Sequence, residues 1–471
     1  MLRTHTCGEL RKKDNGKKVQ LTGWIDRVRV VGKTTFMVLK DRYGRTQIIL
    51  DEKSKLKRGY CIKVSGKVVK RKDVNKNMPT GDIEIVADKI DVLSKSKPMP
   101  FELDSENVAE DLRLKYRYLD LRRDKIQNNL MMRHKIINFI RGEFDDKDFV
   151  EISTPLLTKS TPEGARDFIV PSRIHPGKFY ALPQSPQQYK QLLMVAGFDK
   201  YYQVAPCLRD EDARAHRSPG EFYQLDVEMS FVEQEDILDV IENVFVKLVK
   251  KILPNKKLTF TKFPRLKYDD VIKKYGTDSP DLRKDKNNPD ELAFCWIVDF
   301  PLFTKQSEDD YFYGAGKKWA PSHHMFTMPK EKDLKYLNTK DAGKIKSYQH
   351  DFVLNGYEIG GGSIRIHDKE IQEKVFDLIG FTKEQKKEFK HLLEAFEYGV
   401  PPHGGIALGL DRALMILLGE PSIREVIAFP KNKNAVDLVV DAPSIIPNEQ
   451  LKDANITLVS KKSSESQKRE K

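Results

Sequence analysis

The chain has 471 residues, of which 83 are Lys or Arg and 70 are Asp or Glu, so its formal net charge is +13. This length exceeds what one hydrophobic core usually organises, and we expect two or three domains. The longest apolar stretches, such as residues 413–418, fall far short of the roughly 20 residues that span a bilayer, and the N-terminus has no apolar signal region, which argues against a membrane or secreted protein.

The cysteines also argue against a secreted protein, because the four of them lie far apart in the chain. This spacing argues against a CxxC zinc site and against a dense disulfide framework. We therefore expect reduced thiols in a cytoplasmic protein. The cysteines are Cys7, Cys61, Cys207 and Cys295.

The first hundred residues carry the whole positive excess, with 25 Lys or Arg against 11 Asp or Glu. Such a local excess predicts a polyanion partner, nucleic acid first, although a solubilising lysine surface has the same composition. Alternating apolar and polar residues predict five short strands, as in an OB-fold barrel that binds single-stranded nucleic acid. For Trp24 we expect a core position. The predicted strands cover residues 19–25, 36–39, 46–50, 61–68 and 82–85.

A stretch rich in lysine and proline, residues 95–100, is typical of a linker. Beyond it, helical and strand-like patterns alternate. Apolar residues recur on one helical face from Ile237 to Ile252, and Pro254 marks the end of that helix. The last dozen residues are polar and are expected to form a disordered tail.

Phosphate binding would have to depend on arginines, since neither a GxxxxGK[ST] loop nor a GxGxxG turn between strand and helix is present. Residues 207–228 predict a hairpin of two strands with Arg209, Glu211 and Phe222 at its mouth. Arginine can bind phosphate oxygens with two N–H groups, and Phe222 can stack on a base. Taken alone, such an Arg/Glu pair is usually a surface ion pair.

A second candidate segment, residues 404–412, predicts a strand that turns through glycine into an apolar helix. Glycine lets the backbone approach a ligand closely, and a helix N-terminus favours anions. Arg412 lies in the first turn of this helix. Taken alone, this pattern usually reflects tight packing.

Together the two segments resemble motifs 2 and 3 of the class II aminoacyl-tRNA synthetases, and a helix over 127–142 followed by residues 149–155 resembles motif 1. The resemblance is closest to the bacterial-type aspartyl-tRNA synthetases and runs from about Arg3 to about residue 456. The stretches that carry it are LKYRYLDLRR (114–123), TPEGARD (161–167), QSPQQYKQLLM (184–194) and NGYEIGGGSIRIH (355–367).

The resemblance implies an α+β fold, with an N-terminal OB-fold β-barrel that reads the anticodon and a class II catalytic domain in which helices flank a six-stranded antiparallel sheet. It also implies a homodimer formed through motif 1. The insertion domain common in bacterial-type members would be reduced to a short loop near 283–293, and we expect activity without it. The expected divisions are 1–103 (barrel), 104–125 (linker or hinge), 126–456 (catalytic domain) and 457–471 (polar tail).

The reaction implied by the resemblance joins L-aspartate and ATP into aspartyl-adenylate and then transfers aspartate to the 3′ end of tRNA-Asp, with tRNA-Asn left open as a second substrate. A buried substrate carboxylate needs cations, which Lys190 and Arg365 would supply. Glu163 and Asp226 would contact the α-ammonium. The full set expected at aspartate is Glu163, Gln187, Lys190, Arg209, Asp226, His323 and Arg365.

ATP would lie between two arginines that the resemblance implies to be catalytic, Arg209 at the α-phosphate and Arg412 at the γ-phosphate. Asp351 and Glu358 resemble Mg²⁺ ligands of the family, and carboxylates suit that ion. Departures from the family are His216 and Gly220 in the motif 2 loop and Met325 in place of a proline. The remaining residues expected at ATP are Asp210, Glu211, Ser218, Phe222, Glu358, Gly409, Leu410 and Asp411; those expected at the anticodon are Arg29, Phe36 and Gln47.

Two alternatives stay open. Asparaginyl- and lysyl-tRNA synthetases share the barrel and the motifs, but the pair Lys190 and Arg365 favours an acidic substrate. A non-catalytic tRNA-binding relative is a different class of protein, and it would be free to lose residues such as Arg209 and Arg412, which are present here.

Overall fold

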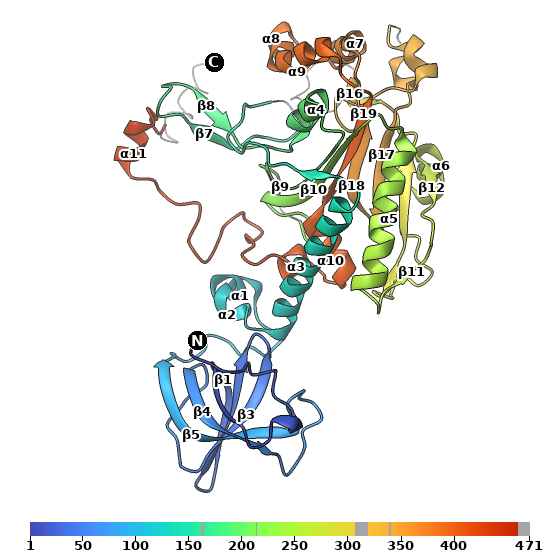
Figure 1. Ribbon diagram of the computed structural model, residues 1–471. Coiled ribbons are helices and arrows are strands. Elements are labelled where there is room, and N and C mark those ends of the chain that lie inside the picture. The colour runs from blue at the N-terminus through green and yellow to red at the C-terminus, as the bar shows by residue number, and fades with distance from the viewer. Residues whose placement is uncertain (162–163, 213, 307–318, 339–340, 460–471) are drawn as a thin grey trace. The chain divides into compact units, whose positions relative to one another are not determined.

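The computed structural model describes residues 1–161, 164–212, 214–306, 319–338 and 341–459. The chain divides into two compact units, Met1–Ala109 and Glu110–Lys471 (Figure 1). Glu163 and the end of the predicted polar tail lie outside the described residues. Within the described ranges, no helix combines the length and apolar character that crossing a membrane requires.

The first unit is a closed five-stranded barrel with the strand order β1-β2-β3-β5-β4, as the sequence predicts. Alternate residues of each strand point inward, because successive side chains in a strand lie on opposite faces, and Leu21, Met37 and Ile48 are among those fully buried in the barrel core. The strands are β1 (Lys18–Val31), β2 (Thr34–Asp41), β3 (Gly44–Leu50), β4 (Cys61–Lys70) and β5 (Ile83–Ser94), and η1 (Lys12–Asp14) precedes them.

The prediction of a core position for Trp24 is wrong, because 39 % of this residue is exposed. It lies between Gly23 and Ile25 on β1, and Ile25 is the residue that is buried. The alternation of β1 therefore turns the indole outward, on the face where polar residues of the strand lie.

The second unit contains an eight-stranded sheet with the order β12-β14-β17-β18-β19-β10-β9-β6. The six strands from β14 to β9 are antiparallel, as the resemblance implies, while the short edge strands β12 and β6 add parallel pairs. The strands are β6 (Val150–Glu151), β9 (Lys200–Arg209), β10 (Gly220–Ser230), β12 (Arg265–Lys267), β14 (Phe294–Val298), β17 (Gln349–Leu354), β18 (Tyr357–Ile364) and β19 (His403–Gly409).

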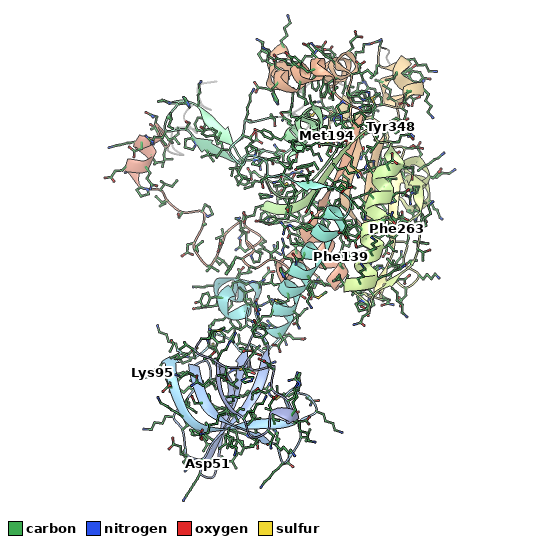
Figure 2. All side chains as sticks on the ribbon, viewed as in Figure 1. Asp51, Lys95, Phe139, Met194, Phe263 and Tyr348 are labelled. Atoms are coloured by element: carbon green, nitrogen blue, oxygen red, sulfur yellow. The ribbon has the colours of Figure 1, made fainter. Side chains whose placement is uncertain are left out.

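Helices α3 and α5 pack together beside this sheet (Figure 1). The helix predicted up to Ile252 is α5 (Gln234–Ile252), and the motif 1 helix is α3 (Asp124–Asp145). Their apolar faces meet an aromatic cluster in which Phe263, labelled in Figure 2, stacks on Phe294 and Phe352. This core packs against one face of the sheet, and the candidate site lies on the other face.

The remaining helices are short and surround the sheet or precede it. They are α1 (Glu110–Lys115), α2 (Arg117–Asp120), α4 (Gln187–Val195), α6 (Tyr268–Tyr275), α7 (Lys369–Ile379), α8 (Lys383–Glu388), α9 (Lys390–Ala395), α10 (Leu410–Leu418) and α11 (Asn448–Asp453), with η3 (Glu331–Tyr336), η4 (Ala342–Lys344), η5 (Phe396–Tyr398) and η6 (Ile423–Glu425). In the described part of the chain, two-stranded sheets pair β7 (Ile169–Pro171) with β8 (Phe179–Ala181), β11 (Lys257–Leu258) with β13 (Glu291–Leu292), and β15 (Phe303–Lys305) with β16 (Trp319–Pro321). Residues 276–290 form the short connection between α6 and β13.

Candidate active site

One face of β10 forms the middle of the candidate site. Residues at every second position of a strand share a face, and here they are Phe222, Gln224, Asp226 and Glu228. Across the β10–β19 ladder, Asp226 pairs with Ala407 and Glu228 pairs with Gly405. The small residues of β19 leave room above the sheet, because a Cβ on Gly405 would lie 2.2 Å from Glu228 Oε2.

Four buried charges meet at the closed end of this site. Lys190 Nζ lies 2.7 Å from Asp226 Oδ1 and 3.1 Å from Glu228 Oε2. Arg365 Nε donates to Glu228 Oε1 at 2.9 Å, and its Nη2 donates to Oε2 at 3.1 Å. Since buried charges are stable only when they are paired, the two cations and two carboxylates hold each other in place.

The pKa values of the two carboxylates are shifted in opposite directions. Burial alone would raise the pKa of Glu228, but the charges of Arg365 and Lys190 outweigh it and lower that pKa to about 2. Burial raises the pKa of Asp226 despite the opposing charge of Lys190. Asp226 Oδ2 has no hydrogen-bond partner among the described residues. This oxygen is therefore free to accept a hydrogen bond from a ligand, such as an ammonium group.

Two adjacent histidines close the other side of the pocket. Burial and the nearby charges of Arg365 and Arg209 lower the pKa of His323 to about 3, so its ring is neutral at pH 7. Arg365 Nη1 contacts Nε2 of His324 at 2.6 Å and donates to Ser363 Oγ at 2.8 Å. These contacts orient the guanidinium from the side opposite Glu228.

A second pocket opens along the same sheet face, towards the mouth of the β9–β10 hairpin. It brings together residues of β9, β10, β18, β19, α10 and the loop between β9 and β10. Its lining includes Arg209, Glu211, His216, Arg217, Ser218, Phe222, Gln224, Glu358, Gly409, Asp411 and Arg412. A flat aromatic ring at one end and cations along the wall suit a nucleotide with a base and phosphates.

Arg209 lines both pockets. Its guanidinium lies 5.2 Å from the centre of the Phe222 ring, and its Nε donates to the Gln184 carbonyl at 3.2 Å. An anion that spans the two pockets would therefore meet this cation. The opposite end of the second pocket has Arg412, which donates to the carbonyls of His216 at 3.3 Å and Glu358 at 2.5 Å.

Three of the predicted nucleotide residues have other main contacts. Asp210 pairs with Arg166 at 3.3 Å on the surface, and Leu410 lies in the hydrophobic core at the start of α10. Asp411 lines the pocket, but its carboxylate accepts from Arg133 and from the Tyr223 N–H. The motif 2 loop residues Arg217 and Ser218 both line the pocket despite the departures noted in the sequence.

Asp351 and Glu358 lie on the β17–β18 hairpin and interact electrostatically. Burial and the charge of Glu358 raise the pKa of Asp351 well above its usual range. A cation between them would relieve this repulsion, and Gly361 keeps the approach open, because a Cβ there would lie 3.2 Å from Asp351 Oδ1. Among the described residues, no group of three or more His, Cys, Asp or Glu side chains forms a metal site.

Most residues predicted at aspartate come together in one pocket, lined by Gln187, Lys190, Arg209, Asp226, His323 and Arg365; Glu163 lies outside the described residues. The sequence reasoning missed Glu228, which binds both cations, and Gln224, which lines both pockets. A signal for both was present, since they alternate with apolar residues on the same strand as Phe222 and Asp226.

The barrel residues predicted at the anticodon share one outer face. Arg29 pairs with Phe36 across β1 and β2, and its guanidinium lies 5.2 Å from the ring centre. Gln47 Nε2 donates to Glu84 Oε2 at 2.8 Å. Because residues two apart on paired strands point the same way, Phe36 and Gln47 lie on this face together.

Both units match families of known proteins. Residues 109–433 match the family model of the class II tRNA synthetases (D, K and N), and residues 19–93 match that of the OB-fold nucleic acid binding domain. Together with the synthetase-like sheet and its two joined pockets, this match is decisive: the chain belongs to the class II tRNA synthetases of the D, K and N group.

The similar proteins have more specific names. The aspartate–tRNA(Asp/Asn) ligase of Thermotoga neapolitana is 41% identical over 589 residues, which cover 97% of this chain and 99% of that protein. The enzyme of the same name from Pelagibacter ubique is 40% identical over 600 residues, covering 98% and 99%. An alignment of 589 positions against 471 residues leaves at least 118 positions of the relative without a counterpart here, in agreement with a missing insertion.

A solved structure supports the fold. The asparaginyl-tRNA synthetase from Pyrococcus horikoshii complexed with asparaginyl-adenylate superposes with a TM-score of 0.74 at 22% identity, covering 95% of this chain and 100% of that one. At this identity the likeness shows the fold and leaves the substrate to be argued from the residues.

Proposed function

We propose that this protein is an aspartate–tRNA ligase, which activates L-aspartate with ATP and transfers it to the 3′ end of tRNA-Asp. The observation that carries the proposal is the convergence of two buried cations, Lys190 and Arg365, in a pocket that shares Arg209 with the nucleotide pocket. An acidic side chain suits two cations, whereas a lysine side chain would be repelled by them.

In the bound complex, the aspartate side-chain carboxylate would accept hydrogen bonds from Lys190 and Arg365. Asp226 Oδ2, which has no partner among the described residues, would accept from the α-ammonium. The α-carboxylate would then face Arg209. Such an arrangement holds the reacting carboxylate beside the nucleotide, and positioning of this kind supplies much of the rate enhancement.

In the first step, an α-carboxylate oxygen attacks the α-phosphorus of ATP, and the bond to the β-phosphate breaks to release pyrophosphate. The carboxylate is already ionised, so no general base is needed. Negative charge grows on the α-phosphoryl oxygens in the transition state, where the fixed charge of Arg209 stabilises it. Arg412 would bind the γ-phosphate, and Phe222 and Glu211 would hold the adenine.

We propose Mg²⁺ as the cofactor, held by Asp351 and Glu358 together with phosphate oxygens of ATP. The raised pKa of Asp351 supports this, since two facing carboxylates are suited to a divalent cation. When bound, the ion would neutralise phosphate charge. Gly361, which leaves space beside Asp351, keeps this approach open to the substrate.

We further propose that the barrel binds the anticodon through Arg29, Phe36 and Gln47, and that the protein forms a homodimer. The homodimer is supported by the edge strand β6, beside which Val150, Leu156 and Leu157 are about half exposed. Exposed apolar residues next to an open strand edge are typical of a surface that another chain covers. Charging of tRNA-Asn is proposed as a second activity, because the relatives carry tRNA(Asp/Asn) in their names.

The test is amino-acid-dependent exchange of pyrophosphate into ATP, with aspartate, asparagine and lysine compared at equal concentration. We expect exchange with aspartate alone. Exchange with asparagine or lysine would overturn the roles of Lys190 and Arg365, and the absence of exchange with any amino acid, with and without tRNA, would favour a non-catalytic tRNA-binding protein. Aminoacylation of purified tRNA-Asp and tRNA-Asn then decides between the two tRNA substrates.

A further inference from the structure

The carboxylate of Asp411 is occupied on both sides by the protein itself. Asp411 lies in the first turn of α10, and only 4 % of the residue is exposed. Its Oδ1 accepts a hydrogen bond from Arg133 Nη1, and its Oδ2 accepts from the Tyr223 N–H at 3.0 Å. Both oxygens therefore have partners before any ligand binds.

The bond to Tyr223 extends the hydrogen bonding of β10 past the end of its ladder with β19. The ladder between β10 and β19 ends where Gln224, the residue after Tyr223, pairs with Gly409. Beyond that point no residue of β19 pairs with β10, and the Asp411 side chain accepts the next N–H instead. This N–H is partly buried, so losing its acceptor would weaken this end of the strand.

Arg133 connects Asp411 to the motif 1 helix. It lies on α3, donates to the Val426 carbonyl at 3.3 Å, and its guanidinium lies 5.7 Å from the centre of the Tyr223 ring. Arg133 lines a neighbouring cavity that also has Tyr223 in its wall and shares Ser218, Phe222 and Asp411 with the nucleotide pocket. One arginine thus contacts β10, α10 and the segment after η6 without being part of the nucleotide pocket wall.

The chain neighbours of the two bonded residues are the residues at opposite ends of the nucleotide pocket. Tyr223 follows Phe222, and Asp411 precedes Arg412. Because adjacent residues of a strand face opposite ways, fixing the Tyr223 backbone fixes the direction of Phe222. In the same way, fixing Asp411 fixes the first turn of α10 and the origin of the Arg412 side chain.

We propose that Arg133 and Asp411 are a positioning pair that sets the span between Phe222 and Arg412 and thereby the affinity for ATP. The inference rests on the proposed function for the identity of the nucleotide. Asp411 would act through Arg133 and Tyr223 rather than as a direct ligand of ATP. An ion pair that serves stability alone would leave ATP affinity unchanged.

The test measures ATP affinity without any amino acid, by calorimetric titration of Mg·ATP into the full chain. We expect Arg133→Met to weaken ATP binding about tenfold, which corresponds to about 1.4 kcal/mol, and Arg133→Lys to recover part of the loss. In the exchange assay, the KM for ATP should rise with little change in the KM for aspartate.

A double-mutant cycle separates positioning from direct contact. If Asp411 acts through Arg133, the variant Arg133→Met/Asp411→Asn should bind ATP no more weakly than Arg133→Met alone. If Asp411 contacts ATP directly, the two losses should add, and this result would overturn the proposal. Asp411→Asn and Arg133→Lys also serve if Arg133→Met does not fold, because they keep the size of the side chain.

The matched control is Arg141→Met, which removes another arginine of α3 that pairs with Glu151 at 2.9 Å. It should lower stability slightly and leave ATP affinity unchanged. Equal loss of ATP binding in both variants, or wild-type affinity in folded Arg133→Met, would refute the pair's role. A chain that binds ATP but activates no amino acid would contradict the proposed function. The calorimetric titration would still show whether Arg133 and Asp411 affect the affinity for ATP.

Discussion

The aspartate pocket and the outer face of the barrel use charge in different ways. In the pocket, Lys190 and Arg365 are buried and hold Glu228 between them. On the barrel, the guanidinium of Arg29 lies over Phe36 with no carboxylate in the pair. Buried charges must be paired with each other even when no ligand is bound, whereas an exposed cation is stabilised by water until a partner binds. Under the proposed function, the pocket would hold one small acid, and the barrel face would meet a flexible polyanion.

The largest effect is expected from removing a buried cation of the pocket, which tests whether buried charges and surface charges act differently. Arg365→Leu should lower aspartate-dependent exchange roughly a thousandfold, since it removes one of the two cations that would meet the buried substrate carboxylate, and losing one partner of a buried charge pair at a binding site costs about 2–5 kcal/mol. Arg365→Lys keeps the charge but loses the two-pronged contact with Glu228, and it should lose less. Near-normal exchange in Arg365→Leu would remove Arg365 from the aspartate site, and circular dichroism checks that both variants fold.

On the barrel, the expected effect is smaller and confined to tRNA. Phe36→Ala should lower kcat/KM for tRNA aminoacylation about tenfold, because stacking of a base on an aromatic ring is worth ~1–3 kcal/mol. Pyrophosphate exchange, which needs no tRNA in this scheme, reports separately on the catalytic unit. The control is Tyr43→Ala, since Tyr43 also lies beside an arginine but in the β2–β3 turn. Equal losses in both variants would contradict a specific role of Phe36.

The smallest expected effect concerns the pH dependence of folding stability. Burial lowers the pKa of His403 from 6.5 to about 4, so the folded chain keeps this ring neutral where the unfolded chain would protonate it. Below pH 6.5 the unfolded state binds the extra proton, and stability falls as the pH drops towards 4. His403→Gln should reduce this slope by up to ~1.4 kcal/mol per pH unit, measured by urea unfolding at several pH values. The control is His175→Gln, which replaces an exposed histidine, and an equal change of slope in both variants would contradict the role of burial at His403.

The sequence was most informative where motifs and strand periodicity agree. The five barrel strands, the motif 2 hairpin and the helix after Gly409 follow from alternation and glycine placement, and the structure confirms them. The convergence of Lys190 with Arg365 could not come from periodicity, because the two are 175 positions apart and only the fold joins them. Only the resemblance to the synthetase motifs predicts that the two side chains meet.

What the sequence could not supply are contacts that depend on three-dimensional closure. Glu228 had no motif role, yet it is the residue that both cations touch. Nothing in the sequence distinguishes Arg133 from the other polar residues of α3. Its contact with Asp411 is evident only in the structure. Trp24 was misplaced because a large aromatic residue in a strand is buried more often than not, while the alternation of β1 decides the matter here.

The position of Glu228 also limits how this pocket can evolve. A single substitution of Lys190 or Arg365 leaves Glu228 with half of its counter-charge, and a side chain on Gly405 would collide with its carboxylate. A descendant that accepts a neutral amino acid must therefore change a cation and Glu228 together, or pass through an unstable intermediate. The coupling of Glu228 to both cations, more than the room available, therefore resists a change in the charge of the substrate.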